Sequence, residues 1–227
     1  MSQYLVYAVG LIAQVLFSAR LLVQWIASER AKEVQSPVIF WQLSMIASLM
    51  LCLYGWLRND FAIILGQFIA FYVYIWNLNA KGSWQKVPKL FRIIVICIPI
   101  AAVVYFISDL PVVIEKLFRQ DDIPMWLIIF GVVGQFTFTL RFVYQWWYSR
   151  RAGESLLPIT FWLISLTGSA MIIAYAILRR DPVLILGQAT GFIVYIRNIM
   201  IAMKSKRNGQ EEALPAPGDD YPEAAGE

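Results

Sequence analysis

Long apolar runs fill most of the chain, and short polar connections separate them. About 18 or more apolar residues indicate a membrane-spanning helix, and six runs meet this length: residues 4–27, 37–57, 61–79, 125–148, 157–178 and 182–203. A seventh run, residues 93–107, is shorter and contains Pro99. Trp and Tyr often lie near the ends of the runs, as in the aromatic belt of membrane proteins. The pattern predicts an all-α integral membrane protein.

The first three runs are repeated in the last three. When the chain is shifted by 121 residues, residues 14–77 fall on residues 135–198 without a gap, and about 27 of the 64 positions are identical. The identical positions include charged and amide residues inside the apolar runs, such as Arg20 and Arg141. Shared hydrophobicity alone would not match such residues. The chain therefore contains two copies of one three-helix unit.

The connections between the runs predict how the two copies are oriented. The first connection of each copy is basic, and basic loops stay in the cytoplasm. Both can do so only if residues 93–107 also cross the membrane. We therefore predict seven transmembrane helices, arranged as two parallel three-helix repeats joined by a linker helix, with the N-terminus outside and the C-terminus inside. Basic residues favour this orientation by roughly two to one. The inner side would hold Arg30, Lys32, Lys81, Lys86, Lys89, Arg92, Arg150, Arg151, Lys204, Lys206 and Arg207, and the outer side Arg58, Lys116, Arg119, Arg179 and Arg180.

This plan divides the chain into four parts. Residues 1–80 form the first repeat, residues 81–123 the linker with the fourth transmembrane helix, and residues 124–204 the second repeat. Residues 205–227 are rich in Pro, Gly, Ala and acidic residues. Such a segment cannot bury enough apolar surface to fold, so we predict a disordered cytoplasmic tail.

Composition narrows the possible chemistry. The chain is 59% hydrophobic, with a formal net charge of +4 and no histidine. Its mean hydropathy of +0.62 is well above that of a soluble domain. Histidine is the commonest metal ligand and general base, so we expect neither a metal nor a cofactor, and no enzymatic activity. The basic residues lie at the ends of the runs, where topology explains them, and we expect no nucleic-acid partner. Cys52 and Cys97 lie inside apolar runs and resemble core residues.

Two arginines inside apolar runs are the main functional candidates. Arg20 lies eight residues before the expected inner end of its helix at Ser28, which is roughly 12 Å at 1.5 Å per residue. Its equivalent is Arg141. Each arginine could snorkel to the inner surface or pair with an acid. Alternatively, both guanidinium groups, together with Gln24 and Gln145, could face a central cavity and bind a phosphate, whose geometry suits the planar fork of arginine.

Other duplicated polar and aromatic residues could line the same cavity. On a helix, residues three and four apart share a face. By this rule a sugar-binding surface would contain Gln67, Gln188, Tyr74, Tyr195, Asn77, Asn198, Trp41 and Trp162. Hydrogen bonding between helices is an equally good explanation of the amides and tyrosines. The small residues of the second runs, such as Gly168, and Gly66 in the third run are expected to allow close helix packing.

Charged residues near the ends of the runs form a further group. They are Glu33, Glu154, Arg58, Arg179, Asp60 and Asp181. Salt bridges that close the turns are one explanation, and a gate is the other. The repeats are not identical, because Trp76 corresponds to Arg197. An asymmetric site on a symmetric scaffold suits an asymmetric substrate.

The repeated residues resemble a known family. The string Gln-x5-Arg-x3-Gln-Trp, followed by Ser, Pro, Phe-Trp, Ser, Tyr, Gly-Gln and Tyr-x2-Asn, resembles the lipid-A-biosynthesis N-terminal domain family and occurs twice. The predicted architecture is also similar to that of the SWEET and PQ-loop transporters. The Pro-Gln dipeptide is absent, however, because Pro37 precedes Val38 and Pro158 precedes Ile159. The second likeness is therefore one of architecture only.

The first resemblance implies a function in envelope glycan modification. Stand-alone members look like accessory proteins of pathways that attach an amino sugar to lipid A. The expected function is a flippase of an undecaprenyl-phosphate-linked sugar in the bacterial inner membrane, with the polyprenyl-phosphate-linked sugar and membrane lipids as partners. A facilitator of small free sugars is one alternative. The other is a non-transporting membrane subunit of a glycosyltransferase, which would then also be a partner.

Overall fold

The computed structural model describes residues 3–57, 61–107, 124–180 and 182–212. Within these ranges the chain forms seven α-helices and one 3-10 turn. They are α1 (Gln3–Ala31), α2 (Val38–Leu57), α3 (Phe61–Ala80), η1 (Trp84–Lys86), α4 (Lys89–Ile107), α6 (Met125–Ala152), α7 (Ile159–Leu178) and α8 (Pro182–Glu212). In a bilayer a helix satisfies its own backbone hydrogen bonds, so uninterrupted apolar runs become helices. The all-helical prediction is confirmed.

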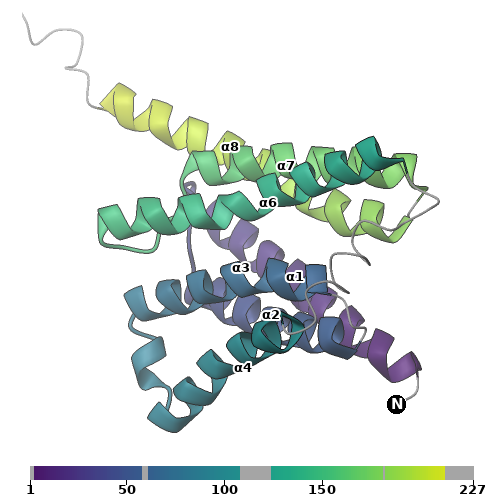
Figure 1. The fold of residues 1–227 in the computed structure, drawn as a ribbon. Helices are drawn as coiled ribbons and strands as arrows, with labels where there is room; N and C mark the ends of the chain where they lie inside the picture. Colours follow the sequence, from purple (N-terminus) through teal and green to yellow (C-terminus); the bar gives the residue numbers. More distant parts are fainter. Residues whose placement is uncertain (1–2, 58–60, 108–123, 181, 213–227) are drawn as a thin grey trace, which may run out of the picture.

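Six helices form a closed ring. In each repeat the middle helix packs against the other two, α2 against α1 and α3, and α7 against α6 and α8. The repeats meet where α1 contacts α8 and where α3 contacts α6. Exchanging the repeats turns one of these interfaces into the other, as a pseudo-two-fold arrangement requires. Figure 1 shows α6, α7 and α8 as one half of the molecule and α1, α2, α3 and α4 as the other.

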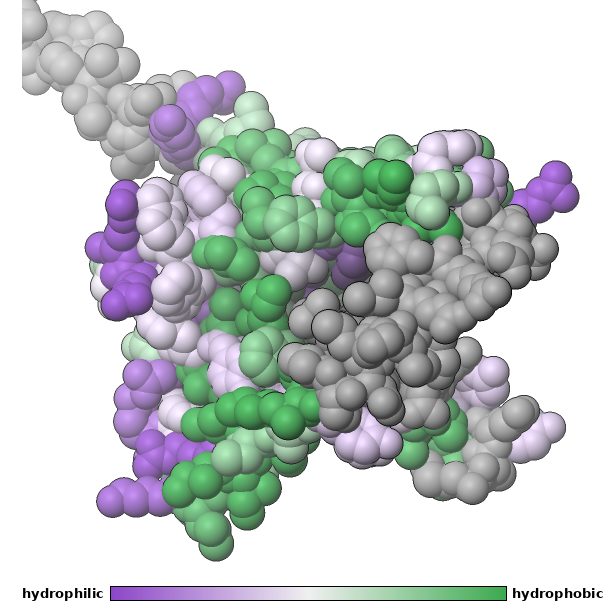
Figure 2. Space-filling model, viewed as in Figure 1, coloured by the Kyte–Doolittle hydropathy of each residue, from purple (hydrophilic) through white to green (hydrophobic). Residues whose placement is uncertain are grey.

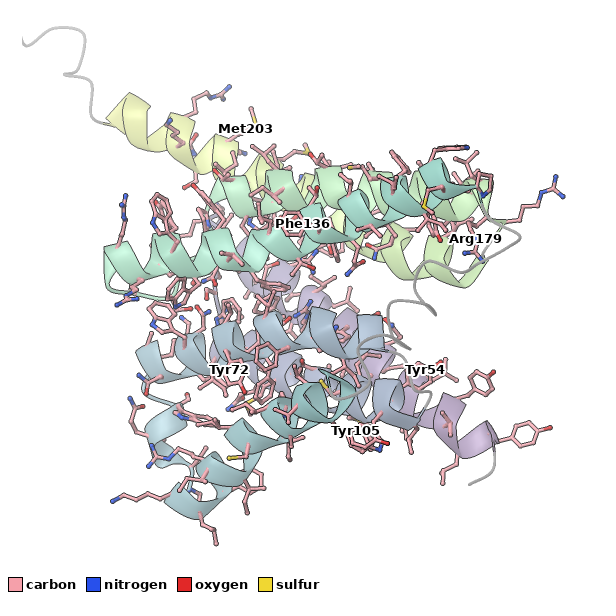
Figure 3. All side chains as sticks on the ribbon, viewed as in Figure 1. Tyr54, Tyr72, Tyr105, Phe136, Arg179 and Met203 are labelled. Carbon is pink, nitrogen blue, oxygen red and sulfur yellow. The ribbon has the colours of Figure 1, made fainter. Side chains whose placement is uncertain are left out.

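The linker helix α4 packs outside this ring, against α2 and α3. The hydroxyl of Tyr72 in α3 donates to the carbonyl oxygen of Ile96 at 2.9 Å. The rings of Trp56 and Tyr105 lie 4.4 Å apart, and Figure 3 shows Tyr72 and Tyr105 in this half of the molecule. An apolar pocket of about 230 Å³ lies between α2 and α4, with Cys52 and Ala102 in its lining.

The outer faces of the helices are apolar. Large hydrophobic side chains such as Leu11, Val104 and Phe136 are more than 60% exposed, and Figure 2 shows apolar surface over both halves of the molecule. Four described helices are long and apolar enough to cross a bilayer: Tyr4–Ala31, Val38–Leu57, Met125–Ala152 and Ile159–Leu178. A surface of this kind suits lipid rather than water. These features indicate a multi-pass membrane protein.

Close packing of helices depends on particular glycines. A Cβ atom at Gly168 in α7 would lie 2.7 Å from the backbone nitrogen of Phe138 in α6. Duplicated contacts occur at Gly10 and Gly131, where a Cβ atom would meet the rings of Tyr54 and Tyr175 at 2.9 and 2.8 Å. The sequence pattern predicted close packing at Gly168, but it did not indicate Gly10 or Gly131. Among the described residues, a Cβ atom at Gly66 would touch only a side-chain nitrogen at 3.9 Å, so no close helix contact of the Gly168 kind is seen there.

Several helices extend beyond the apolar runs that predict them. Helix α1 continues to Ala31 and α6 to Ala152. A helix makes its own backbone hydrogen bonds, so its end can extend beyond the apolar core of the membrane into the polar interface. Helix α8 continues to Glu212. Its last eight residues therefore lie in the segment predicted to be disordered, and residues 213–227 lie outside the described residues.

Candidate functional site

Arg20 and Arg141 lie side by side at the interface between the repeats. Arg20 in α1 is 6% exposed and Arg141 in α6 is 5% exposed. The guanidinium carbons of Arg20 and Arg141 lie 5.8 and 4.5 Å from the centre of one ring, that of Phe142. They are therefore no further apart than the sum of these distances. The ring offers both cations a cation–π contact.

The guanidinium group of Arg20 has partners within its own repeat. One terminal nitrogen donates to the hydroxyl of Ser44 in α2 at 2.8 Å and to the hydroxyl of Tyr74 in α3 at 3.1 Å. The ring of Phe17 lies 4.6 Å from the guanidinium carbon. Nε of Arg20 is buried and has no hydrogen-bond partner among the described residues. Arg20 is thus held by three helices of the first repeat.

Arg141 occupies the equivalent position without equivalent bonds. Its guanidinium carbon lies 3.2 Å from the centre of the Phe138 ring. One terminal nitrogen is buried and has no partner. Among the described residues, none accepts a hydrogen bond from Arg141, and no carboxylate forms an ion pair with Arg20 or Arg141. Two buried cations without a counter-ion are a site that an anion could occupy.

Four buried side-chain amides join the repeats in two reciprocal pairs. Gln24 of α1 and Asn198 of α8 exchange hydrogen bonds of 2.8 and 3.0 Å. Gln145 of α6 and Asn77 of α3 exchange bonds of 2.9 and 3.0 Å. All four side chains are 0% exposed. The structure therefore pairs these amides with each other, and their predicted contact with a phosphate or sugar stays a prediction.

Each glutamine also fixes the connection that follows its helix. Nε2 of Gln145 lies 2.8 Å from the hydroxyl of Ser149 and 2.9 Å from the carbonyl oxygen of Leu156. The backbone N–H of Leu156 donates in turn to Ser149. Gln24 makes the same contacts to Ser28 and Gln35. The Gln-x3-Ser spacing of the sequence thus positions both a loop and an interface between repeats.

The two tryptophans of the predicted site differ in their hydrogen bonds. Nε1 of Trp41 donates to the hydroxyl of Ser36 at 2.9 Å. Ser36 lies 3.0 Å from the hydroxyl of Ser155, which donates to Asn77 at 2.7 Å. Nε1 of Trp162 is buried without a partner. Both indoles are 0% exposed, so neither lies at an open cavity mouth.

The remaining predicted lining residues surround the arginines or lie further along the helices. Tyr74 and Tyr195 are 1% and 4% exposed, and their rings lie 6.1 and 6.0 Å from those of Trp41 and Trp162. Gln188 accepts a hydrogen bond from Ser169 at 3.1 Å. The equivalent oxygen of Gln67 is buried without a partner.

The three predicted gate residues that the structure describes are exposed and lie apart from the buried arginines. Glu33 is exposed and accepts a hydrogen bond from Gln35 at 2.7 Å. Arg179 donates to the hydroxyl of Tyr175 at 3.0 Å, at the opposite end of the second repeat from Met203 (Figure 3). Burial lowers the pKa of the Lys81 ammonium, and the nearby Glu154 carboxylate opposes this shift. Residues 58, 60 and 181 of the predicted gate lie outside the described residues.

Comparison with known proteins identifies the family. The family described as Lipid A Biosynthesis N-terminal domain matches residues 9–79 and 130–200. The chain belongs to the Lipid A Biosynthesis N-terminal domain family. Its two family segments begin 121 residues apart, which is the offset of the internal repeat, so the duplication is confirmed.

Members of this family include parts of longer proteins. The chain is 29% identical over 214 residues to the lipid-A-disaccharide synthase of Chlamydia caviae, covering 90% of this chain and 34% of that relative. It is 30% identical over 220 residues to the lipid-A-disaccharide synthase of Chlamydia felis, with the same coverage. The chain thus spans about a third of the length of these relatives. No solved structure is significantly similar to it.

Within the two family segments, the structure adds residues that the sequence analysis missed. Phe142 corresponds to Leu21, so the ring that both arginines approach exists in one repeat only. Arg197 was identified, but its partner was not. It forms an ion pair with Glu29 of α1, in which one of its terminal nitrogens lies 3.0 Å from Oε2. Glu29 corresponds to Arg150, so no repeat symmetry indicated this pair.

Proposed function

We propose that this protein is a flippase of an undecaprenyl-phosphate-linked sugar, an amino sugar, in the bacterial inner membrane, supporting the modification of lipid A. The observation that carries the proposal is the pair of buried guanidinium groups of Arg20 and Arg141. Placing one arginine in a membrane helix costs about 2.5–3.5 kcal/mol. A phosphate that binds between the repeats would offset this cost.

The proposal includes a membrane orientation. All seven described α-helices would cross the bilayer as two parallel repeats joined by α4, with the N-terminus outside and the C-terminus inside. The ends of α1, α3 and α6, and most of the basic residues, would then lie in the cytoplasm. Figure 2 shows hydrophilic surface from both halves of the molecule along the left edge of the view, and this common position supports placing these ends in the cytoplasm.

The contacts between the repeats support alternating access. The two amide pairs, the Ser36–Ser155 contact and the Arg197–Glu29 ion pair lie near the proposed cytoplasmic ends of their helices. The arginines lie further from that end. This conformation would therefore be closed on the cytoplasmic side, and rocking of the repeats would open it. A long prenyl chain could remain in the lipid throughout.

A second candidate function is a membrane subunit of a glycosyltransferase. The observation that favours it is the similarity to the lipid-A-disaccharide synthases of Chlamydia, of which this chain covers 34%. A facilitator of free sugars is less well supported, because an uncharged sugar would leave the two buried cations without compensation.

A leaflet assay in proteoliposomes separates these functions. A radiolabelled polyprenyl-phosphate amino sugar is incorporated into both leaflets, and an impermeant amine-reactive reagent is added outside. A flippase makes the inner-leaflet pool reactive, whereas protein-free liposomes leave it protected.

The double variant Arg20→Gln/Arg141→Gln should lose this activity although it still inserts. Uptake of labelled free sugar without exposure of the lipid would instead indicate a facilitator. If the wild-type protein neither exposes the lipid-linked sugar nor takes up free sugar, the flippase proposal is contradicted and a role as a glycosyltransferase subunit is favoured.

A further inference from the structure

The two halves of the arginine site share an arginine and a tryptophan at equivalent positions, but these residues do not make the same hydrogen bonds. In the first repeat, Arg20 donates to Ser44 and Tyr74, and Trp41 donates to Ser36. In the second repeat, a terminal nitrogen of Arg141 and Nε1 of Trp162 are buried without partners. Nε of Arg20 is also buried without a partner, so the repeats differ in that Arg20 and Trp41 each donate hydrogen bonds to protein groups, whereas Arg141 and Trp162 donate none among the described residues.

Sequence differences between the repeats accompany this asymmetry. The position equivalent to Ser36 is Leu157, an apolar residue that is 5% exposed. Trp162 therefore lacks the hydroxyl that Trp41 uses. Next to Arg141 stands Phe142, where the first repeat has Leu21. The guanidinium carbon of Arg141 lies 3.2 Å from the Phe138 ring centre and 4.5 Å from that of Phe142.

The two free donors belong to one aromatic cluster. The ring centre of Phe142 lies 5.8 Å from that of Phe161, which is 4.9 Å from Trp162. On the other side, Phe138 lies 6.3 Å from Tyr195, which is 6.0 Å from Trp162. Two chains of ring contacts thus join Arg141 to Trp162. An apolar setting of this kind makes an unpaired donor costly and a hydrogen bond to an anion strong.

We infer that the second repeat carries the ligand-binding half of the site, where Arg141 and the indole N–H of Trp162 bind the oxygens of one phosphate group. Arg20 is a positioning residue, held by Ser44 and Tyr74, that adds charge without giving up its own bonds. The inference rests on the proposed function, because it assigns the phosphate of the same lipid to one half of the site. A duplicated scaffold thereby binds an asymmetric headgroup in one orientation.

Matched pairs of variants test this division. The purified full chain in phosphatidylcholine nanodiscs is titrated with farnesyl phosphate by calorimetry, with farnesol and inorganic phosphate as comparison ligands. Thermal unfolding is measured for every variant. Arg141→Gln should weaken farnesyl phosphate binding about tenfold or more, because a charge-assisted hydrogen bond is lost, without lowering the melting temperature. Arg20→Gln should lower the melting temperature and weaken binding less.

The tryptophans form the second matched pair. Trp162→Phe should weaken binding at least about threefold and lower the melting temperature less than Trp41→Phe does, because both changes remove similar buried volume but the Trp162 N–H has no partner to lose. Trp41→Phe should lower the melting temperature, because it leaves Ser36 without its donor. If Arg20→Gln weakens binding as much as Arg141→Gln, or if Trp162→Phe destabilises as Trp41→Phe does, the division is wrong.

The comparison ligands keep the two proposals apart. Equal loss in both arginine variants, with lipid flipping still dependent on the pair, overturns the division alone. Farnesol binding as tightly as farnesyl phosphate would overturn the anion site and the proposed function together. Inorganic phosphate binding as tightly as farnesyl phosphate would assign the site to a free anion, and would overturn the lipid substrate.

Discussion

At the scale of single residues, the buried amides show how polar groups are accommodated between apolar helices. A side-chain amide has two donors and an acceptor oxygen. The Gln145–Asn77 pair satisfies each of these groups with the other residue, a neighbouring loop or a helix carbonyl. If only one residue of the pair were replaced, the other would keep buried polar atoms without partners. The effects of the two substitutions on the free energy of unfolding should therefore depend on one another.

A double-mutant cycle tests this dependence. Asn77→Leu alone should destabilise the fold by about 1–3 kcal/mol, because Gln145 then lacks its partner. The double variant Asn77→Leu/Gln145→Leu should cost less than the sum of the two single variants. Unfolding in denaturing detergent gives the free energies. The equivalent pair Asn198 and Gln24 serves as a replicate, and strict additivity at both pairs would contradict the reciprocal bonding.

At the scale of helices, small residues decide how closely neighbours approach. Gly168 brings α7 so near to α6 that a Cβ atom would lie 2.7 Å from the backbone of Phe138. The first repeat has Ala47 at this position, so the equivalent contact between α1 and α2 already accommodates a methyl group. Gly168 thus lets α7 approach the helix that carries Arg141 more closely than an alanine would allow.

Gly168→Ala should therefore separate α6 and α7 and destabilise the protein by about 1–3 kcal/mol, as overpacking does. Gly66→Ala is the matched control, because its Cβ atom would meet only one side-chain atom at 3.9 Å. That change should be neutral or stabilise by about 0.5–1 kcal/mol, since alanine favours a helix. Thermal unfolding in detergent compares the stability of the two variants. Equal changes in stability would show that α6 and α7 can move apart without cost.

At the scale of the whole molecule, the ring of six helices joins two repeats through polar contacts near one end. Ser36 and Ser155 mark this end, with their hydroxyls 3.0 Å apart. They belong to different repeats, follow α1 and α6, and are buried. Any rocking that opens this end must separate them.

A disulfide at this position should therefore stop transport. In a Cys52→Ala/Cys97→Ala background, Ser36→Cys/Ser155→Cys should crosslink under oxidising conditions, since the two side chains already meet. Oxidised protein should no longer expose the lipid-linked sugar, and a reducing agent should restore activity. The single variant Ser36→Cys controls for the substitution itself. Full activity of the crosslinked protein would show that this end stays closed during transport.

The sequence by itself determined the elements and their duplication. Apolar length fixed the helices, because a membrane helix satisfies its own backbone within one segment. An offset of 121 residues revealed the repeat, because polar residues such as Arg20 and Arg141 recur at it. The sequence also identified which side chains would be unusual at such depth. Apolar length is a local property of each segment, and the repeat is found by comparing one part of the chain with another.

Only the tertiary structure decided the partners. Helical periodicity shows which face of its own helix carries Gln24 or Asn77. In the structure each pairs with a residue of the other repeat: Gln24 with Asn198, and Asn77 with Gln145. The periodicity of one helix does not determine which face of another it will meet. Likewise, identical spacing could not indicate that Arg20 is bonded and Arg141 is not. In the folded structure, Phe142 contacts both guanidinium groups. Leu157, which stands where the first repeat has Ser36, offers Trp162 no side-chain acceptor for its N–H.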